Sequence, residues 1–328
     1  MAMGSEFVGE LAALLAAFFW AASSLMFGRL GRQISPVVLN LVKGVFAIAF
    51  ILITLIIQST WQSTGAISDP LATESALPTR SALYLIISGG LGIGLGDTAY
   101  FAAINALGAR RALLLETLAP PMAAVLAWIF LAEQLSWVAT AGILVTLIGI
   151  AWVVSERVPG NEKVSPGPGI LIALVATFCQ AAGAVFSRAA LADTAVSPLW
   201  SSLIRLAAGL AFMGGLVAIR PQLIESKSLA NSASEPQPSR WRAVLTTLKS
   251  PRLLSKIAGV SFFATYLGIW LQQISLKYTA AGIAQALLAT SPLFVLPMAA
   301  ILGDRISPRS VLGVAIALSG VWLLLSVS

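Results

Sequence analysis

Residues 34–43 read ISPVVLNLVK, and residues 196–205 read VSPLWSSLIR. Each stretch opens with an aliphatic residue and a Ser-Pro pair, and each ends on a basic residue, Lys43 or Arg205. The spacing is the same in both, which indicates an internal repeat. Further matches lie on both sides of the two stretches: Phe19, Phe27 and Arg29 with Phe178, Phe186 and Arg188, and residues 119–136 with residues 290–307.

The repeat divides the chain into two related halves. We predict the first half at residues 8–155 and the second at residues 169–328, with a linker at residues 156–168. A polar stretch at about residues 221–250 is expected to be a mobile loop. Residues 1–7 contain Gly-Ser-Glu-Phe, which is typical of a cloning remnant, and we leave them out of the fold prediction.

The composition indicates that lipid surrounds most of the molecule. Of 328 residues, 58% are apolar and 10% are charged, and the mean hydropathy is +0.91. A soluble domain needs about a quarter of its residues charged to cover its surface. The net charge of +7 arises from basic residues in short gaps between apolar runs, so we interpret it as facing lipid headgroups and not nucleic acid.

Ten apolar runs are long enough to cross a bilayer, which takes about 20 residues of helix. They lie at residues 8–27, 36–57, 82–104, 112–131, 137–154, 169–186, 199–219, 254–274, 280–302 and 311–327. Because each half holds five spans, the second half must enter the membrane from the opposite side. We therefore predict an all-α integral membrane protein with ten transmembrane helices in two inverted five-helix repeats, a design that places a solute site where the repeats meet.

Three motifs carry a family resemblance: the Ser-Pro pair before a basic residue, the turns at residues 106–109 and 275–278, and the Pro followed by Leu-x-Glu or Leu-x-Asp. On these motifs the chain resembles the EamA family of the drug/metabolite transporter superfamily, over nearly its whole length after Phe7. The resemblance implies ten helices, alternating access, and export or exchange of amino acids, other metabolites or drugs.

Four charged residues lie well inside predicted spans, away from the span ends, where charges are costly and by default mark function: Lys43, Asp97, Glu116 and Arg205. The first three lie at similar depths from one face, so a Lys43–Asp97 pair with Glu116 nearby is possible. Such a pair could lock helices together or bind a solute or a proton. Arg205 has no acid near it in its own half, and it could bind a carboxylate or phosphate, or reach helix-end carbonyls or headgroups.

Polar and aromatic residues extend this candidate pathway. Tyr266, Trp270 and Gln273 share one helical face. The complete set of predicted substrate-binding or pathway residues is Trp20, Asn40, Lys43, Asp97, Tyr100, Glu116, Gln180, Arg205, Tyr266, Trp270, Gln273 and Gln285. They could line a cavity for an amphipathic or aromatic solute, whereas hydrogen bonding between helices explains any single one equally well.

Proline and glycine predict two local features. Pro120, Pro121 and Pro292 lie in mid-span, where they are expected to kink the fourth and ninth helices, either as a gate or for packing. The stretch Gly89–Gly96 holds two overlapping G-x-x-x-G spacings, which favour close helix packing.

Several kinds of function are excluded or disfavoured by the residue content. The chain has no histidine and one cysteine, Cys179, so we expect no histidine-based catalysis, no metal site and no cofactor. An intramembrane aspartyl protease would use Gly94-Leu95-Gly96-Asp97, but only Glu116 could serve as its second carboxylate. A membrane scaffold without a transport cycle is the other alternative.

We expect a secondary carrier that exports amino acids or related metabolites, because no Walker motif is present. Exchange of phosphorylated sugars or nucleotide sugars is the second choice, and export of cationic drugs is another. Membrane lipids and a small solute are the expected partners, protons are a candidate coupling ion, and the bacterial inner (plasma) membrane is the expected location.

The basic residues also bear on orientation. Fifteen of the 20 lie in loops after odd-numbered spans, and three lie on the other side. Positive-inside logic then places both termini outside the cell. The family resemblance implies cytoplasmic termini, so the two indications disagree.

Overall fold

The computed structural model describes residues 2–30, 36–63, 77–107, 109–155, 166–219, 250–301 and 307–326. Within these ranges the chain forms helices joined by turns, and no strand. The first half contains α1 (Ala2–Leu30), α2 (Pro36–Ser63), α3 (Thr79–Ser88), η1 (Gly89–Gly96), α4 (Asp97–Leu107), α5 (Ala109–Glu116), α6 (Ala119–Leu131) and α7 (Trp137–Val154). The second half contains α8 (Pro166–Leu191), α9 (Pro198–Ile219), α11 (Pro251–Val260), η4 (Ser261–Leu267), α12 (Gly268–Tyr278), α13 (Ala281–Leu288), α14 (Ser291–Ile301) and α15 (Pro308–Leu325).

The all-helical membrane fold predicted from the sequence is confirmed. Nine helical stretches of the described residues are long and apolar enough to cross a membrane. The span predicted at residues 112–131 is divided between α5 and α6. Large apolar side chains cover the outside, with Phe130 72% and Trp137 90% exposed, as lipid contact requires. The mobile loop predicted at about 221–250, apart from Ser250, and the linker as far as residue 165 lie outside the described residues.

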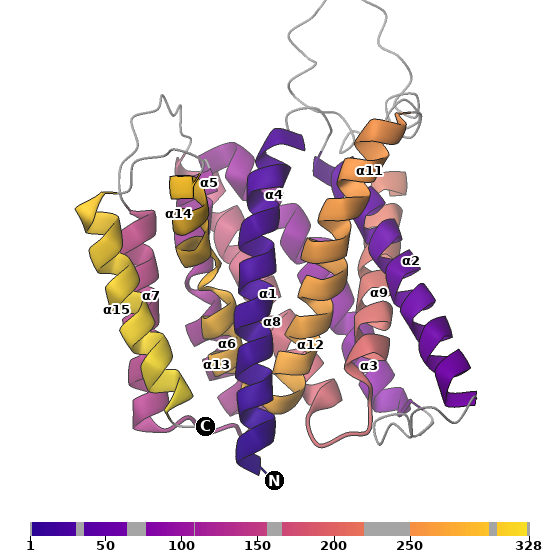
Figure 1. Cartoon of the computed structure of the whole chain (residues 1–328), viewed down its shortest axis with the longest axis horizontal. Coiled ribbons are helices and arrows are strands. Elements are labelled where there is room, and N and C mark those ends of the chain that lie inside the picture. The colour runs from indigo at the N-terminus through magenta and orange to yellow at the C-terminus, as the bar shows by residue number, and fades with distance from the viewer. Residues whose placement is uncertain are drawn as a thin grey trace, which may run out of the picture.

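The two halves run in opposite directions through the bundle. In Figure 1 the third span of the first half starts at the bottom with α3 and ends at the top with α4, whereas its counterpart starts at the top with α11 and ends at the bottom with α12. The fourth spans are reversed in the same way, from α5 down to α6 and from α13 up to α14. Both chain ends lie at the bottom face, as expected for two inverted halves of five spans each.

Each half packs against the third span of the other half. α1 contacts η4 and α12, and α8 contacts η1 and α4. The correspondence holds for single residues, since Gly268 lies against Trp20 of α1, and Gly96 lies against Cys179 of α8. A Cβ at either glycine would meet these side chains, so glycine permits the close approach of the two helices.

A π-helical turn interrupts both third spans, at η1 and at η4. Such turns widen the helix and occur often at functional sites. In η4 one backbone carbonyl has a partner from the other half, because Trp20 Nε1 donates a hydrogen bond to Ala264 O at 2.7 Å. In η1 the sequence is Gly89-Gly90-Leu91-Gly92-Ile93-Gly94-Leu95-Gly96, so five of its eight residues are glycine.

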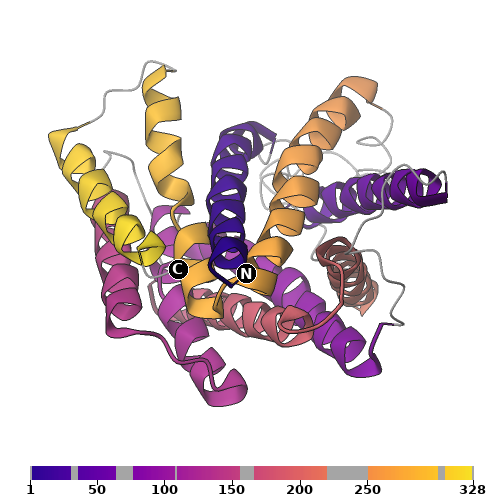
Figure 2. The ribbon, with the colours of Figure 1, turned by 60° about the horizontal axis from the view of Figure 1, so that its bottom comes forward.

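The fifth spans, α7 and α15, pack against each other at one edge of the bundle, where Figure 2 shows them side by side. Four glycines with the same spacing in both helices form this seam: Gly142, Gly149, Gly313 and Gly320. A Cβ on Gly149 would collide with the backbone of Ala317, and a Cβ on Gly320 would collide with Thr146. The two backbones are therefore in direct contact.

The fourth span of each half is broken in the middle. α5 ends at Glu116 and α6 begins at Ala119, with Pro120 and Pro121 in the first turn of α6. In the second half, α13 ends at Leu288 and α14 begins at Ser291, followed by Pro292. Proline is tolerated in a first helical turn because the N–H it lacks has no partner there. At these prolines the chain starts a new helix, and their gating role stays a prediction.

Candidate functional site

Asp97 lies at the boundary between η1 and α4 and joins the two halves. Gln180 of α8 donates a hydrogen bond from Nε2 to Asp97 Oδ1 at 2.9 Å. From α2, Asn40 and Lys43 both interact with the Asp97 carboxyl group, and Asn40 Nδ2 also donates a hydrogen bond to Met213 Sδ at 3.3 Å. The structure thus brings together Asn40, Lys43, Asp97 and Gln180, all of which the sequence marks as candidates.

Arg205 of α9 enters the same region from the second half. Its side chain is 2% exposed, and Nη1 donates a hydrogen bond to Gln272 Oε1 at 2.8 Å. Its own half supplies no acid near Arg205 among the sequence candidates, but the first half does. Asp97 of the first half is an electrostatic partner of the guanidinium.

The Arg205 guanidinium has an N–H donor that no described residue accepts from. Among the described residues its Nε has no hydrogen-bond partner. A guanidinium carries five N–H donors, and leaving a buried donor unpaired costs about 1–3 kcal/mol. Gly92 of η1 makes the room for this side chain, since a Cβ at Gly92 would lie 3.1 Å from Arg205 Nη2. The arrangement leaves the guanidinium able to bind one more acceptor.

Glu116 and Tyr100 form the next part of the site. Their side chains share a hydrogen bond, and both interact electrostatically with Asp97. Glu116 is the last residue of α5, directly before the break in the fourth span. The neighbouring carbonyl of Leu115 accepts a hydrogen bond from Thr177 Oγ1 of α8 at 3.3 Å. A second carboxylate, which interacts electrostatically with Asp97, therefore lies at the point where the helix is interrupted.

Three predicted pathway residues have packing roles. Tyr266 is 6% exposed, and its hydroxyl lies 2.8 Å from Thr54 Oγ1 of α2, a hydrogen-bonding distance. Its ring packs against Phe262 and Trp270. Trp20 donates its indole N–H to η4. These contacts fix the interface between α1, α2 and the third span of the second half.

Gln273 and Gln285 are both buried. Ser201 Oγ of α9 donates a hydrogen bond to Gln273 Oε1 at 2.7 Å, whereas Gln273 Nε2 has no partner among the described residues. In the described part of the chain no hydrogen bond joins Gln285 to Lys43, Asp97, Glu116 or Arg205. Gln273 thus lies on the α9–α12 interface beside Arg205 and Gln272, and Gln285 is not brought into this group.

Two features of the structure were not predicted. Glu10 is 1% exposed in α1, and it could have been counted with the charges inside spans, since it lies within the predicted first span. Gln272 is adjacent in the sequence to Gln273, but only Gln273 was predicted as a pathway residue. Only the packing of α9 on α12 shows that Gln272 is the one that accepts from Arg205.

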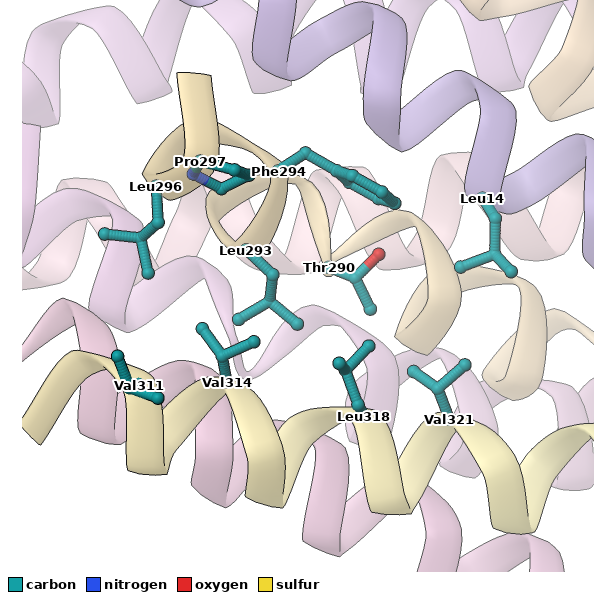
Figure 3. Close-up of a pocket in the computed structure, with 10 residues that line it drawn as sticks. All are labelled: Leu14, Thr290, Leu293, Phe294, Leu296, Pro297, Val311, Val314, Leu318 and Val321. Carbon is teal, nitrogen blue, oxygen red and sulfur yellow. The ribbon is translucent and has the colours of Figure 1, made fainter. Parts of the chain in front are cut away.

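An apolar cavity of about 360 Å³ opens between α1, α14 and α15. Figure 3 shows its lining side chains, which are Leu14, Thr290, Leu293, Phe294, Leu296, Pro297, Val311, Val314, Leu318 and Val321. The single polar side chain, Thr290, donates its hydroxyl to Leu287 O at 2.6 Å. A cavity with this lining suits hydrocarbon, and none of the four charged site residues lines it.

A duplicated, inverted bundle with charges from both halves converging at their interface defines a class, the polytopic membrane transporters built from inverted repeats. The chain belongs to the EamA-like transporter family, whose family model matches residues 7–155 and 167–326. The resemblance stated from the sequence motifs is thereby confirmed.

Comparison with solved structures supports the same fold. One solved structure, described as the crystal structure of a protein, aligns with this chain at a TM-score of 0.66 and 18% sequence identity. The alignment covers 98% of this chain and 96% of the other chain. At that identity the match shows the fold alone. No curated protein matches the chain significantly.

Family membership settles the broad class of function. The chain is an integral membrane transporter of small solutes and is not an enzyme, because transporters of the EamA-like family are not enzymes. The intramembrane protease and the scaffold considered from the sequence are therefore set aside. Lipids and a small solute are its partners.

Proposed function

We propose that the protein is a secondary carrier that exports amino acids or related metabolites by alternating access. The observation that carries this proposal is the Arg205 guanidinium, which is buried, bonded to Gln272 and left with an unpaired Nε. A substrate carboxylate fits such a donor group, since guanidinium and carboxylate have matching geometry.

The charges around Arg205 favour a zwitterionic solute. Two cations, Lys43 and Arg205, and two acids, Asp97 and Glu116, share the region, so their formal charges cancel. A solute with one carboxylate and one ammonium group can exchange partners with this set without leaving a net charge inside the membrane. Each half contributes at least one of these charged residues, which fits a solute site at the interface between inverted halves.

The alternative solutes fit less well. A phosphorylated sugar or nucleotide sugar needs several cations around one phosphate, whereas both cations here have Asp97 as a neighbour. A cationic drug needs an excess of acids, and the two acids are matched by two cations.

We propose protons as the coupling ion, with Asp97 or Glu116 as the group that binds them. Both carboxylates lie inside the membrane region and at helix boundaries, and they interact electrostatically. Glu116 is hydrogen-bonded to Tyr100, and it adjoins the broken fourth span, where a change of charge can reach the backbone. The bacterial inner (plasma) membrane is the proposed location.

Solute flux into proteoliposomes tests the proposal. Purified protein is reconstituted, and counterflow of radiolabelled amino acids, a sugar phosphate and a cationic dye is measured, with Arg205→Lys as the variant. We expect counterflow of at least one amino acid, and a reduction of at least ~10-fold in the variant, which keeps the charge but loses the planar fork. Counterflow of the sugar phosphate or dye alone would contradict the proposed substrate class.

Proton coupling has its own measurement in the same vesicles. An imposed pH gradient should drive net amino-acid uptake in the unmodified protein. In Glu116→Gln, or in Asp97→Asn, the gradient should no longer drive uptake. A gradient-independent rate in the unmodified protein would contradict coupling to protons.

A further inference from the structure

One ion pair joins the two halves at the face where both chain ends lie, away from the buried charges. Arg188 Nε of α8 lies 2.5 Å from Glu133 Oε1, and each side chain is 16% exposed. Glu133 belongs to the first half, in the segment after α6, and Arg188 belongs to the second half, near the end of α8. The pair therefore crosses from one repeat to the other.

Both partners also hold the turn between α12 and α13. Arg188 Nη1 donates to the carbonyls of Leu276 at 3.1 Å and Lys277 at 2.7 Å, close to the end of α12. Glu133 Oε2 accepts a hydrogen bond from the Ala281 N–H, at the start of α13, at 3.0 Å. A cation at a helix C-terminus and an anion at a helix N-terminus are each stabilised by the helix dipole.

The backbone presents Glu133 in a defined position. Ala132 has a φ of 54°, in the left-handed region, and the Glu133 N–H donates to Ala127 O at 3.3 Å. This is the geometry of a helix that ends in a tight reversal. Lys277 Nζ donates to Val196 O at 2.8 Å, which ties the end of α12 to the turn after α8. The two second-half groups that bind Glu133, the Arg188 side chain and the Ala281 N–H, are thus linked to each other through the turn between α12 and α13.

We propose that Glu133 and Arg188 form a gate that closes this face of the transporter. When the pair and the Glu133–Ala281 bond are made, the end of α6 is held against the ends of α8 and α12 and the start of α13. When they break, these ends of the two halves separate. The proposal rests on the proposed alternating-access cycle, in which a transporter of inverted repeats must close one face while the other is open.

The gate is tested by a distance between the halves, which needs no solute. Spin labels are placed on cysteines at Gln134 and Ala195, which are exposed and belong to opposite halves, in a Cys179→Ala background. The distance distribution is measured by double electron–electron resonance in lipid nanodiscs. We expect one main distance without further substitution.

Glu133→Gln should add a longer distance, with a ratio of open to closed molecules raised at least tenfold, which corresponds to about 1.4 kcal/mol. Arg188→Lys retains the charge but replaces the guanidinium, which reaches Glu133 from Nε and the two carbonyls from Nη1, with a single ammonium nitrogen, so it should give a smaller rise. Glu6→Gln removes a negative charge at an exposed position of α1 near the same face, and it should leave the distribution unchanged.

A static brace gives a different result. If Glu133→Gln and Arg188→Lys both keep the distance distribution of the unmodified protein, the gate is overturned, whatever happens to their melting temperatures. Arg188→Lys keeps the test decisive if Glu133→Gln does not fold. Because the distance is measured without a solute, failure of the amino-acid counterflow leaves this result interpretable, and failure of the gate leaves the counterflow result unaffected.

Discussion

Gln180 and Asp97 are bonded across the boundary between the two repeats, with Gln180 Nε2 and Asp97 Oδ1 2.9 Å apart. One comes from the first span of the second half, and the other from the third span of the first half. Since Lys43 and Arg205 also act on Asp97 electrostatically, this carboxylate is the group on which contacts from both halves converge. A change at Asp97 therefore tests the whole site.

Asp97→Asn should abolish transport, with at least a ~10-fold loss of initial flux, because it removes the charge that offsets Lys43 and Arg205. Asparagine retains an acceptor for Gln180, so expression, the elution volume and helicity should stay unchanged. Flux in proteoliposomes measures the effect, and Asp193→Asn, at an exposed position of the turn after α8, is the control. Unaltered flux in Asp97→Asn would mean that the residue is structural.

Gly92→Ala should reduce transport more than stability. The added methyl group would lie 3.1 Å from Arg205 Nη2, so the guanidinium would have to move by a few tenths of an ångström. Gly90→Ala is the matched control, because a Cβ at Gly90 meets nothing within 4 Å in the same π-helix. Flux and melting temperature are measured for both. Equal flux in the two variants would show that the position of Arg205 does not matter.

Gly149→Ala should destabilise the protein by about 1–3 kcal/mol, because its Cβ would collide with the backbone of α15. Gly214→Ala in α9 is the control, since a Cβ there meets nothing within 4 Å and alanine favours helix by up to about 1 kcal/mol. The melting temperature in one detergent should fall for the first variant and stay level or rise for the second. A melting temperature that is equal in Gly149→Ala and the unmodified protein would contradict the close contact of α7 and α15.

Ser326→Cys tests orientation. The described chain begins and ends at one face, and most basic residues follow odd-numbered spans, which reach the other face. The positive-inside rule then places Ser326 outside the cell. In a Cys179→Ala background, a membrane-impermeant maleimide should label intact cells expressing Ser326→Cys. Labelling only after permeabilisation would favour the cytoplasmic termini that the family resemblance implies.

The fold was predictable because its signals are long and repeated. Ten apolar runs and the recurring Ser-Pro motif define the spans and the duplication without any knowledge of contacts. The two π-helical turns were not predictable, because they depend on the packing of the third span of each half against the other half. η1 is rich in glycine, whereas η4 consists mainly of aromatic and polar residues. The two segments therefore have no common composition from which a π-helix could be predicted.

The site was predictable in part. Charges inside membrane spans are rare, so Lys43, Asp97, Glu116 and Arg205 stood out from the sequence, and in the structure the other three all interact electrostatically with Asp97. Their partners were harder to foresee, since the acid next to Arg205 comes from the other half. Tyr266 has the residue type expected in a cavity but bonds to Thr54 of α2, a contact that only the tertiary structure defines.

The glycines of α7 and α15 limit how the protein can move. Backbone already touches backbone along these two helices, so they cannot come nearer, and moving them apart would lose the close packing that the glycines permit. A rearrangement that keeps this packing moves the remaining spans around α7 and α15, which then serve as a fixed axis.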